Sequence, residues 1–246
     1  ASYGICVFLG IVLGIIFAIK YFSKFNNIKK EDVIFCSCYA VIGLGLGAKL
    51  LYIITNIPFL IQNYQNINWE IIEQMFRGGF VFYGGLIGAV IGILIYSIQF
   101  KISFKSLLLT LLPTVPLIHS IGRIGCFLAG CCYGIEYTGF GHIIFHNTQF
   151  APINIPLFPT QIVESLLNMI IFIILIVTYR KYIGTYKTIT LYCILYSIVR
   201  FFLEFLRGDL IRGGWLIFST SQWISILLLI VGILLHIKKD KIEDKT

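Results

Sequence analysis

Seven long apolar stretches limit what this chain can fold into. They cover residues 3–23, 33–55, 79–99, 104–118, 157–179, 188–206 and 220–237. Most of them approach the roughly 20 residues that a helix needs to cross the hydrocarbon core of a bilayer. A spanning segment must satisfy its own backbone hydrogen bonds, so each stretch is predicted to be a helix. The sequence therefore predicts an all-α integral membrane protein with seven transmembrane helices, in a single domain over residues 1–246.

The composition excludes an ordinary water-soluble domain. Of the 246 residues, 58% are hydrophobic and only 12% are charged, and the mean hydropathy is +0.92. Soluble domains carry about 25% charged residues. The net charge of +8 does not indicate binding to nucleic acid, because most Lys and Arg residues stand in clusters beside the apolar stretches. Anionic membrane headgroups are the partner that these clusters predict.

The basic clusters also predict the orientation of the chain. They fall within residues 20–30, 101–105, 180–187 and 238–245. Cytoplasmic loops of membrane proteins carry such an excess of Lys and Arg. We therefore expect the C-terminus inside, and the N-terminus and loops 56–78, 119–156 and 207–219 outside. The first apolar stretch lacks a basic n-region and is too long for a signal-peptide h-region, so no cleavable signal peptide is expected.

Loop 56–78 has an amphipathic helical pattern. One face would carry Ile67, Ile71, Ile72 and Met75, and the other Glu70, Glu73 and Gln74. This pattern predicts a short interfacial helix on the outer leaflet. A small helix packed on the bundle fits the pattern equally well.

Regularly spaced glycines predict close packing between helices. Small residues at such spacing let helix backbones approach each other in lipid. The glycines with this spacing are Gly10, Gly14, Gly43, Gly45, Gly47, Gly84, Gly88 and Gly92.

The segment from His119 to Gly134 is the most informative part of the chain. It combines His119, Arg123, three cysteines and four glycines in an otherwise apolar protein. A guanidinium at membrane depth costs about 2.5 kcal/mol or more unless it is paired or wetted. Arg123 therefore needs an anionic partner, and a lipid phosphate is the expected one. The glycines would let backbone come close to that ligand.

Further ionisable residues are predicted at the outer ends of their helices. Arg200, Glu204 and Arg207 share one helix face through their spacing of four and three. Glu164 and Asp209 lie at the same predicted depth, where a headgroup site would need them. The alternative is a buried ion-pair network that only holds helices together, above all between Arg200 and Glu204.

Several side chains near this segment have more than one interpretation. His119 is either a general base or a satisfied interfacial histidine. Cys126, Cys131 and Cys132 are nucleophiles, metal ligands or packing residues. Adjacent cysteines do not easily chelate one tetrahedral ion, so no metal site and no cofactor are expected. Tyr83 fits an aromatic belt at the outer interface as well as a site.

The motifs resemble those of the bacterial prolipoprotein diacylglyceryl transferase family. The matching blocks follow the family's order over almost the whole chain. They are Tyr3-Gly4, Gly79 to Gly88, Gly122-Arg-Ile-Gly125 with Phe127 and Gly134, Pro159-Thr-Gln161 with Glu164, Arg200-Phe-x-x-Glu204-Phe-x-Arg207 with Asp209, and Ser221-Gln222.

The resemblance implies a reaction and a set of site residues. The family moves the diacylglyceryl group of phosphatidylglycerol onto a cysteine thiol of a lipoprotein precursor, in the bacterial cytoplasmic membrane, at the extracytoplasmic leaflet. The residues then expected in catalysis are Tyr3, Tyr83, His119, Arg123, Cys126, Cys131, Arg200 and Glu204. Those expected to bind substrate are Gly84, Gly85, Gly122, Arg123, Gly125, Gly134, Gln161, Glu164, Arg200 and Arg207.

Three positions depart from the family's pattern. Tyr83 replaces a histidine, Cys126 an asparagine and Cys131 an acid. These changes put the acceptor in doubt more than the lipid donor. The first alternative is a paralogue that uses the same anionic lipid but modifies another acceptor. A cysteine-linked intermediate is one route for that reaction. A non-catalytic lipid-binding or transport protein is the second, although the chain has no inverted repeat of the transporter kind.

Overall fold

The computed structural model describes residues 2–63, 68–69, 71, 73, 75, 78–79, 81–209 and 214–243. Seven helices in these ranges are long and apolar enough to cross a membrane, which confirms the predicted fold class. They are Ser2–Phe25, Lys30–Gln62, Tyr83–Phe100, Phe104–Ala129, Thr160–Tyr182, Lys187–Leu206 and Thr220–Ile237. Their orientation in the membrane stays a prediction. The predicted interfacial helix falls largely outside the described residues, since Ile67, Glu70, Ile72 and Gln74 are not among them.

The helices form two compact units, Ala1–Asn26 with Leu109–Thr246, and Asn27–Leu108. We call these the main unit and the hairpin unit, and describe each by itself. Whether the chain is a single domain stays a prediction.

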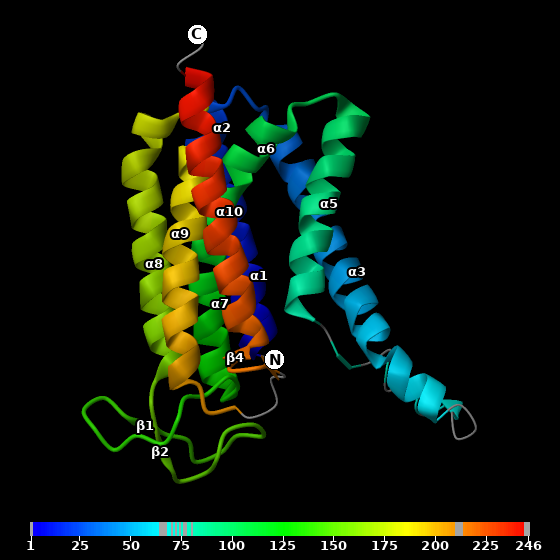
Figure 1. Ribbon diagram of the computed structural model, residues 1–246, viewed down its shortest axis with the longest axis vertical. Coiled ribbons are helices and arrows are strands. Elements are labelled where there is room, and N and C mark those ends of the chain that lie inside the picture. Colours follow the sequence, from blue (N-terminus) through cyan, green and yellow to red (C-terminus); the bar gives the residue numbers. More distant parts are fainter. Residues whose placement is uncertain are drawn as a thin grey trace. The chain divides into compact units, whose positions relative to one another are not determined.

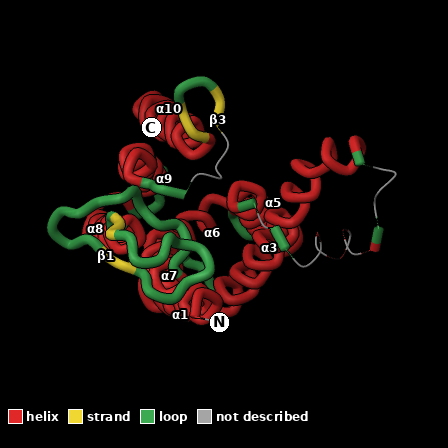
Figure 2. The backbone as a smooth tube through the Cα atoms, turned by 90° about the horizontal axis from the view of Figure 1, so that it is seen from below, coloured by secondary structure: helices red, strands yellow, loops and turns green. Residues whose placement is uncertain are grey.

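The main unit is a bundle of long helices, two of which are joined by a long connection over residues 130–159 (Figure 1). It contains α1 (Ser2–Phe17), η1 (Ala18–Phe22), α2 (Ser23–Phe25), the end of α6 (Phe104–Leu111), η3 (Leu112–Thr114), α7 (Val115–Ala129), α8 (Thr160–Tyr179), η4 (Arg180–Tyr182), α9 (Lys187–Leu203), η5 (Glu204–Leu206) and α10 (Thr220–Glu243). Neighbours pack in the order α1, α7, α8, α9 and α10, as the end-on view shows (Figure 2).

Two short antiparallel pairs close loops at one end of this bundle. Strand β1 (Ile143–Ile144) pairs with β2 (Pro156–Leu157), and β3 (Gly214–Trp215) pairs with β4 (Phe218–Ser219). Isolated bridges join Gly134 to Arg207 and Glu136 to Leu157. The loop between α7 and α8 is therefore tied at its base to the segment that follows α9.

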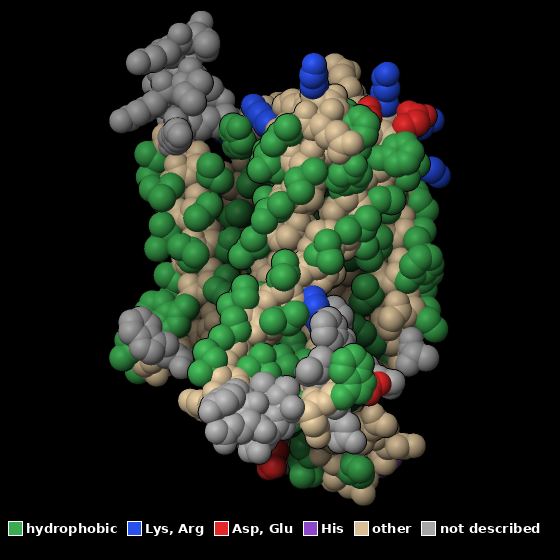
Figure 3. Space-filling model, turned by 90° about the vertical axis from the view of Figure 1, so that its right-hand side faces the viewer, with side chains coloured by type: hydrophobic (Ala, Val, Ile, Leu, Met, Phe, Trp, Pro, Cys, Tyr) green, Lys and Arg blue, Asp and Glu red, His purple; other side chains and the backbone are tan. Residues whose placement is uncertain are grey.

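Helix α8 has its polar face inside and its apolar face outside. Gln161, Glu164, Ser165 and Asn168 are buried, whereas Leu166, Ile170, Ile173 and Val177 are exposed at helical spacing. A soluble helix has the reverse arrangement. Hydrophobic side chains likewise cover the flanks of the helices on the face drawn in Figure 3. The helices therefore present apolar surface outward, as lipid contact requires, and keep ionisable groups inside.

The fourth spanning helix is longer than the sequence analysis expected. The prediction ended it at residue 118 and placed His119 and Arg123 in a loop, but helix runs through to Ala129. Gly125 does not break the helix, because α1 packs there: a Cβ at Gly125 would lie 3.2 Å from Tyr3 Cα. The helix ends instead at Gly130, which adopts a left-handed φ of 71°.

The hairpin unit contains α3 (Lys30–Gln62) and α5 (Phe82–Phe100), which pack against each other. A Cβ at Gly43 or Gly47 would overlap carbonyl oxygens of Gly88 or Gly84. The packing role predicted for these glycines is therefore confirmed. It is wrong for Gly45, which has nothing within 4 Å of its Cβ position.

Candidate functional site

The predicted site residues of the main unit gather at one end of its bundle. Arg123 lies toward the end of α7, Glu164 in the first turns of α8, and Arg200 in the last turn of α9. This end also holds the N-terminus and the β1–β2 pair (Figure 1). The basic residues Lys20, Lys24, Arg180 and Lys181 lie at the other ends of α1 and α8.

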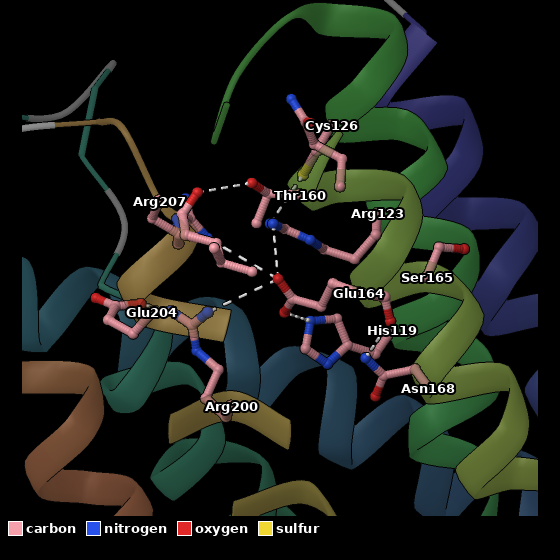
Figure 4. A network of polar contacts seen from close by, with 12 residues as sticks. His119, Arg123, Cys126, Thr160, Glu164, Ser165, Asn168, Arg200, Glu204 and Arg207 are labelled. Atoms are coloured by element: carbon pink, nitrogen blue, oxygen red, sulfur yellow. Dashed lines mark hydrogen bonds and ion pairs between the residues drawn. The ribbon is translucent and has the colours of Figure 1, made fainter. Parts of the chain in front are cut away.

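Glu164 is the centre of the site (Figure 4). Its Oε2 atom lies 2.8 Å from Arg123 Nη2, 3.7 Å from Arg200 Nη1 and 4.0 Å from Arg207 Nη1. Its Oε1 atom lies 3.3 Å from His119 Nε2. Three guanidinium groups, one from α7 and two from the end of the sixth spanning helix and the residue after it, thus meet at one buried carboxylate, as the predicted convergence requires.

Arg200 has two further partners at the start of α10 and in η5. Its Nη2 atom lies 2.8 Å from Glu204 Oε2 and donates a hydrogen bond of 3.0 Å to Ser221 Oγ. The spacing of four residues brings Arg200 and Glu204 together, which confirms that part of the predicted shared face. Arg207 is not on a helix face, because the helix ends before it and its backbone is extended. Ser221 holds the guanidinium from α10, a fourth spanning helix of the site, and it had no predicted role.

Arg207 is held by a carboxylate and by backbone. Its Nε and Nη2 atoms donate to Asp209 Oδ1 and Oδ2 at 2.9 and 2.8 Å. Burial disfavours its charge, but the hydrogen bonds with Asp209 and the negative charges of Cys132 and Asp209 outweigh burial and raise the pKa of Arg207. The Arg207 backbone forms the bridge to Gly134. A Cβ at Gly134 would overlap the Phe158 carbonyl and the Thr160 hydroxyl, so only glycine fits there.

The ionic network leaves donors unused. Each arginine has one carboxylate oxygen at 2.8 Å, so an ion-pair network is present around Glu164. Even so, among the described residues Arg123 Nε and Arg200 Nη1 are buried without a hydrogen-bond partner. Buried donors of this kind are normally satisfied. These two N–H groups therefore make no hydrogen bond within the described site, although Arg200 Nη1 lies 3.7 Å from Glu164 Oε2.

The remaining predicted residues have different surroundings. Gln161 Nε2 donates to the Cys131 carbonyl at 2.9 Å, which ties α8 to the end of α7. Tyr3 is 49% exposed on α1. Gly122 has only Val7 within reach, at 4.0 Å from its Cβ position. Their roles in catalysis or substrate binding stay predictions.

Tyr83, Gly84 and Gly85 belong to the hairpin unit. Gly84 and Gly85 lie against α3, where their Cβ positions meet Gly47 and Leu44. Helix packing therefore accounts for both glycines. A substrate role for these three residues stays a prediction.

Comparison with known proteins decides the family. The sequence model described as prolipoprotein diacylglyceryl transferase matches residues 1–238. The chain is 40% identical over 236 residues to phosphatidylglycerol–prolipoprotein diacylglyceryl transferase 2 of Clostridium perfringens, covering 96% of this chain and 89% of that protein.

The chain belongs to the prolipoprotein diacylglyceryl transferase family.

Two further relatives carry the name phosphatidylglycerol–prolipoprotein diacylglyceryl transferase. That of Clostridium tetani is 38% identical over 232 residues, covering 94% of this chain and 90% of its own. That of Clostridium novyi is 34% identical over 248 residues, covering 99% and 93%. The predicted resemblance is thus confirmed, and this member of the diacylglyceryl transferase family is a multi-pass membrane transferase.

This family member also has a thiol cluster beside the arginines. The sulfur atoms of Cys126, Cys131 and Cys132 all lie within 4.8 Å of one another. Arg123 Nη1 lies 3.7 Å from Cys126 Sγ. Hydrogen bonds with the Cys126 and Cys131 thiols, and then the nearby Arg207 and Arg123, lower the pKa of Cys132 against the effect of burial. The sequence left open whether these cysteines are nucleophiles, metal ligands or packing residues, and it did not predict that their sulfur atoms lie together.

Asn168 is a buried residue that the sequence analysis missed. It lies one turn after Glu164 and donates from Nδ2 to the Glu164 carbonyl at 2.8 Å. Ser120 Oγ and Ser165 Oγ lie 3.1 Å apart between α7 and α8. The signal for both was present: polar residues at spacing three and four on an apolar helix share a buried face.

Proposed function

We propose that this protein transfers the diacylglyceryl group of phosphatidylglycerol to the cysteine thiol of a lipoprotein precursor. In the proposed step, the thiolate sulfur attacks the glyceryl carbon that carries the phosphate. The new C–S bond forms as the C–O bond to phosphate breaks, and glycerol phosphate leaves with the bonding electron pair. The names of the relatives and the family match supply the donor and the acceptor.

The observation that carries this proposal is the meeting of three guanidinium groups at Glu164. A leaving phosphate gains negative charge in the transition state, and fixed cationic donors stabilise such charge. Arginine suits this task because its fork of N–H groups matches phosphate oxygens. Arg123 and Arg200 are assigned to the phosphate, since the N–H groups at Arg123 Nε and Arg200 Nη1 make no hydrogen bond within the described site. Glu164, Glu204 and Asp209 orient the three side chains.

His119 is assigned as the base for the acceptor thiol. Its Nε2 atom faces the Glu164 carboxylate at 3.3 Å, which would stabilise an imidazolium once the proton has moved. The proton then passes to the departing phosphate or to solvent. In this assignment His119 takes the role of base that the family's histidine, replaced here by Tyr83, cannot fill.

The site is assigned to the extracytoplasmic leaflet. In the main unit, the basic residues near the ends of α1 and α8 lie away from the arginine site. The positive-inside rule places those basic ends in the cytoplasm and therefore the site outside. A precursor exported across the membrane would meet the site on that side.

The test uses the purified chain, labelled phosphatidylglycerol and a peptide with a lipoprotein-precursor cysteine. We expect a thioether product whose mass equals the peptide plus the diacylglyceryl group, with one glycerol phosphate released per product. The same peptide with serine in place of the cysteine is the control and should give no product.

Three results would contradict the proposal. Peptide-independent release of glycerol phosphate, with mass added to Cys126, Cys131 or Cys132, would indicate the cysteine-linked alternative. Lipid binding without turnover would indicate a non-catalytic protein. Full activity of both Arg123→Ala and Arg200→Ala would remove the arginines from the reaction.

A further inference from the structure

The turn that ends α7 brings three thiols to one point. Gly130 N–H bonds to the Phe127 carbonyl and Cys131 N–H to the Cys126 carbonyl, each at 3.1 Å. This pair of bonds is a Schellman motif, which places the side chains of Cys126 and Cys131 next to each other. Cys132 then takes a left-handed φ of 57°, which L-residues rarely adopt. The chain thereby turns back, and the third sulfur joins the other two.

The spacing of the sulfurs fits a single thiophilic ion. A metal–sulfur bond of about 2.3 Å in a trigonal site separates the sulfurs by about 4 Å. Here all three sulfur atoms lie within 4.8 Å of one another. None of these three cysteines is in a disulfide, and Cys126 is buried while the other two are half-buried. A disulfide would use only two of them and would not explain why the third is present.

Two guanidinium groups stand beside these ligands. Arg123 Nη1 lies 3.7 Å from Cys126 Sγ, and Arg207 lies beside the same turn, because its backbone bridges Gly134, two residues after Cys132. Metal-bound thiolates carry negative charge, and cationic donors next to them offset that charge in a buried place. The same donors would fit a cluster of three thiolates around a cation better than three neutral thiols.

We infer that Cys126, Cys131 and Cys132 form a three-coordinate site for a soft monovalent cation of the Cu(I) class. Thiolate ligands select Cu(I), zinc and iron–sulfur clusters over harder ions. Structural zinc takes four protein ligands. In the described part of the chain, the cluster offers three sulfurs and no His, Asp or Glu. This inference does not rest on the proposed transfer reaction, although the site adjoins Arg123.

The test is an anaerobic Cu(I) titration of the whole chain in detergent, in competition with a Cu(I) chelator. We expect one Cu(I) per chain and a sulfur-to-copper absorption band. Each of Cys126→Ser, Cys131→Ser and Cys132→Ser should weaken binding by about 100-fold or more, because each removes one of three ligands. Cys38→Ser is the matched control, since Cys38 is an exposed thiol on α3, and it should bind as the parent does.

A second measurement covers variants that fail to fold. Alkylation of the unaltered protein, followed by peptide mass spectrometry, should show that one equivalent of Cu(I) protects the three cluster thiols and leaves Cys38 reactive. The inference is overturned by unchanged Cu(I) affinity in the three variants, or by equal alkylation with and without Cu(I). It is also overturned by binding of zinc but not Cu(I), or by a disulfide within the cluster of the isolated protein that excludes copper.

Discussion

The Nη2 atom of Arg123 lies 2.8 Å from the Oε2 atom of Glu164, so one ion pair joins α7 to α8 inside the main unit. Both side chains are almost fully buried, at 7% and 3% exposure. A buried pair of this kind adds little net stability, but the loss of one partner leaves an uncompensated charge. The pair can therefore be separated experimentally into a structural and a catalytic contribution.

Replacing Glu164 by Gln should destabilise the protein by about 3–5 kcal/mol, because three arginines lose their shared counter-ion. Thermal unfolding in detergent would measure the change in stability, and the transfer assay would measure the change in activity. Glu136→Gln is the control, since Glu136 is an exposed residue of the α7–α8 loop. Equal thermal stability of both variants would contradict the central role of Glu164.

The double variant Arg123→Met with Glu164→Gln should recover part of the stability lost in Glu164→Gln, because both members of the closest pair are then neutral. It should not recover transfer activity, since the Arg123 guanidinium that is proposed to bind the lipid phosphate is absent. Recovery of activity along with stability would mean that Arg123 only holds helices together.

Arg123→Lys should retain folding and lose about 100-fold in kcat/KM. The lysine ammonium keeps the positive charge but lacks the forked guanidinium, which bonds Glu164 through Nη2 and has a further N–H group at Nε. Arg180→Lys, in a turn at the other end of α8, is the control and should change neither quantity. Parent-like kcat/KM of Arg123→Lys would show that charge alone suffices.

Gly134→Ala should lower activity strongly, because its Cβ would overlap the Phe158 carbonyl and the Thr160 hydroxyl and push away the bridge to Arg207. Gly4→Ala is the matched control, since nothing lies within 4 Å of its Cβ position. Steady-state kinetics of both variants measure the difference. An active Gly134→Ala would mean that Arg207 does not depend on this bridge.

Gly88→Ala should weaken the hairpin unit, because its Cβ would meet the Gly43 carbonyl of α3. Gly45→Ala on the same helix pair has open space and should be neutral, or stabilising by about 0.5–1 kcal/mol. Protease resistance of the region 30–100 in detergent would compare them. Equal resistance would contradict close packing through these glycines.

The spanning helices and the meeting of charges could be predicted because both follow from local patterns. Length and hydropathy predict a membrane helix, and the spacing of Arg200 and Glu204 predicts a shared face. The central position of Glu164 could not be predicted in this way. It depends on which helices are neighbours, and no local pattern encodes the order α1, α7, α8, α9 and α10.

The errors come from glycines whose effect depends on their neighbours. The prediction placed Gly122 and Gly125 in the loop 119–156, but this segment is helical and α1 packs against it. Gly130, by contrast, does end the helix, and its turn brings Cys131 back to Cys126. The approach of the three sulfur atoms could not be predicted from their spacing, because it depends on a backbone turn that redirects Cys132.

The bridges at the base of the α7–α8 loop have a practical consequence for work on this protein. Gly134 with Arg207 and Glu136 with Leu157 fix the chain on both sides of the β1–β2 excursion. Beyond them the tip at Phe140 and Gly141 is fully exposed or open. An epitope tag or a fluorescent label inserted at this tip should leave the positions of the site arginines unchanged. The tag would report which face of the membrane the tip occupies in living cells.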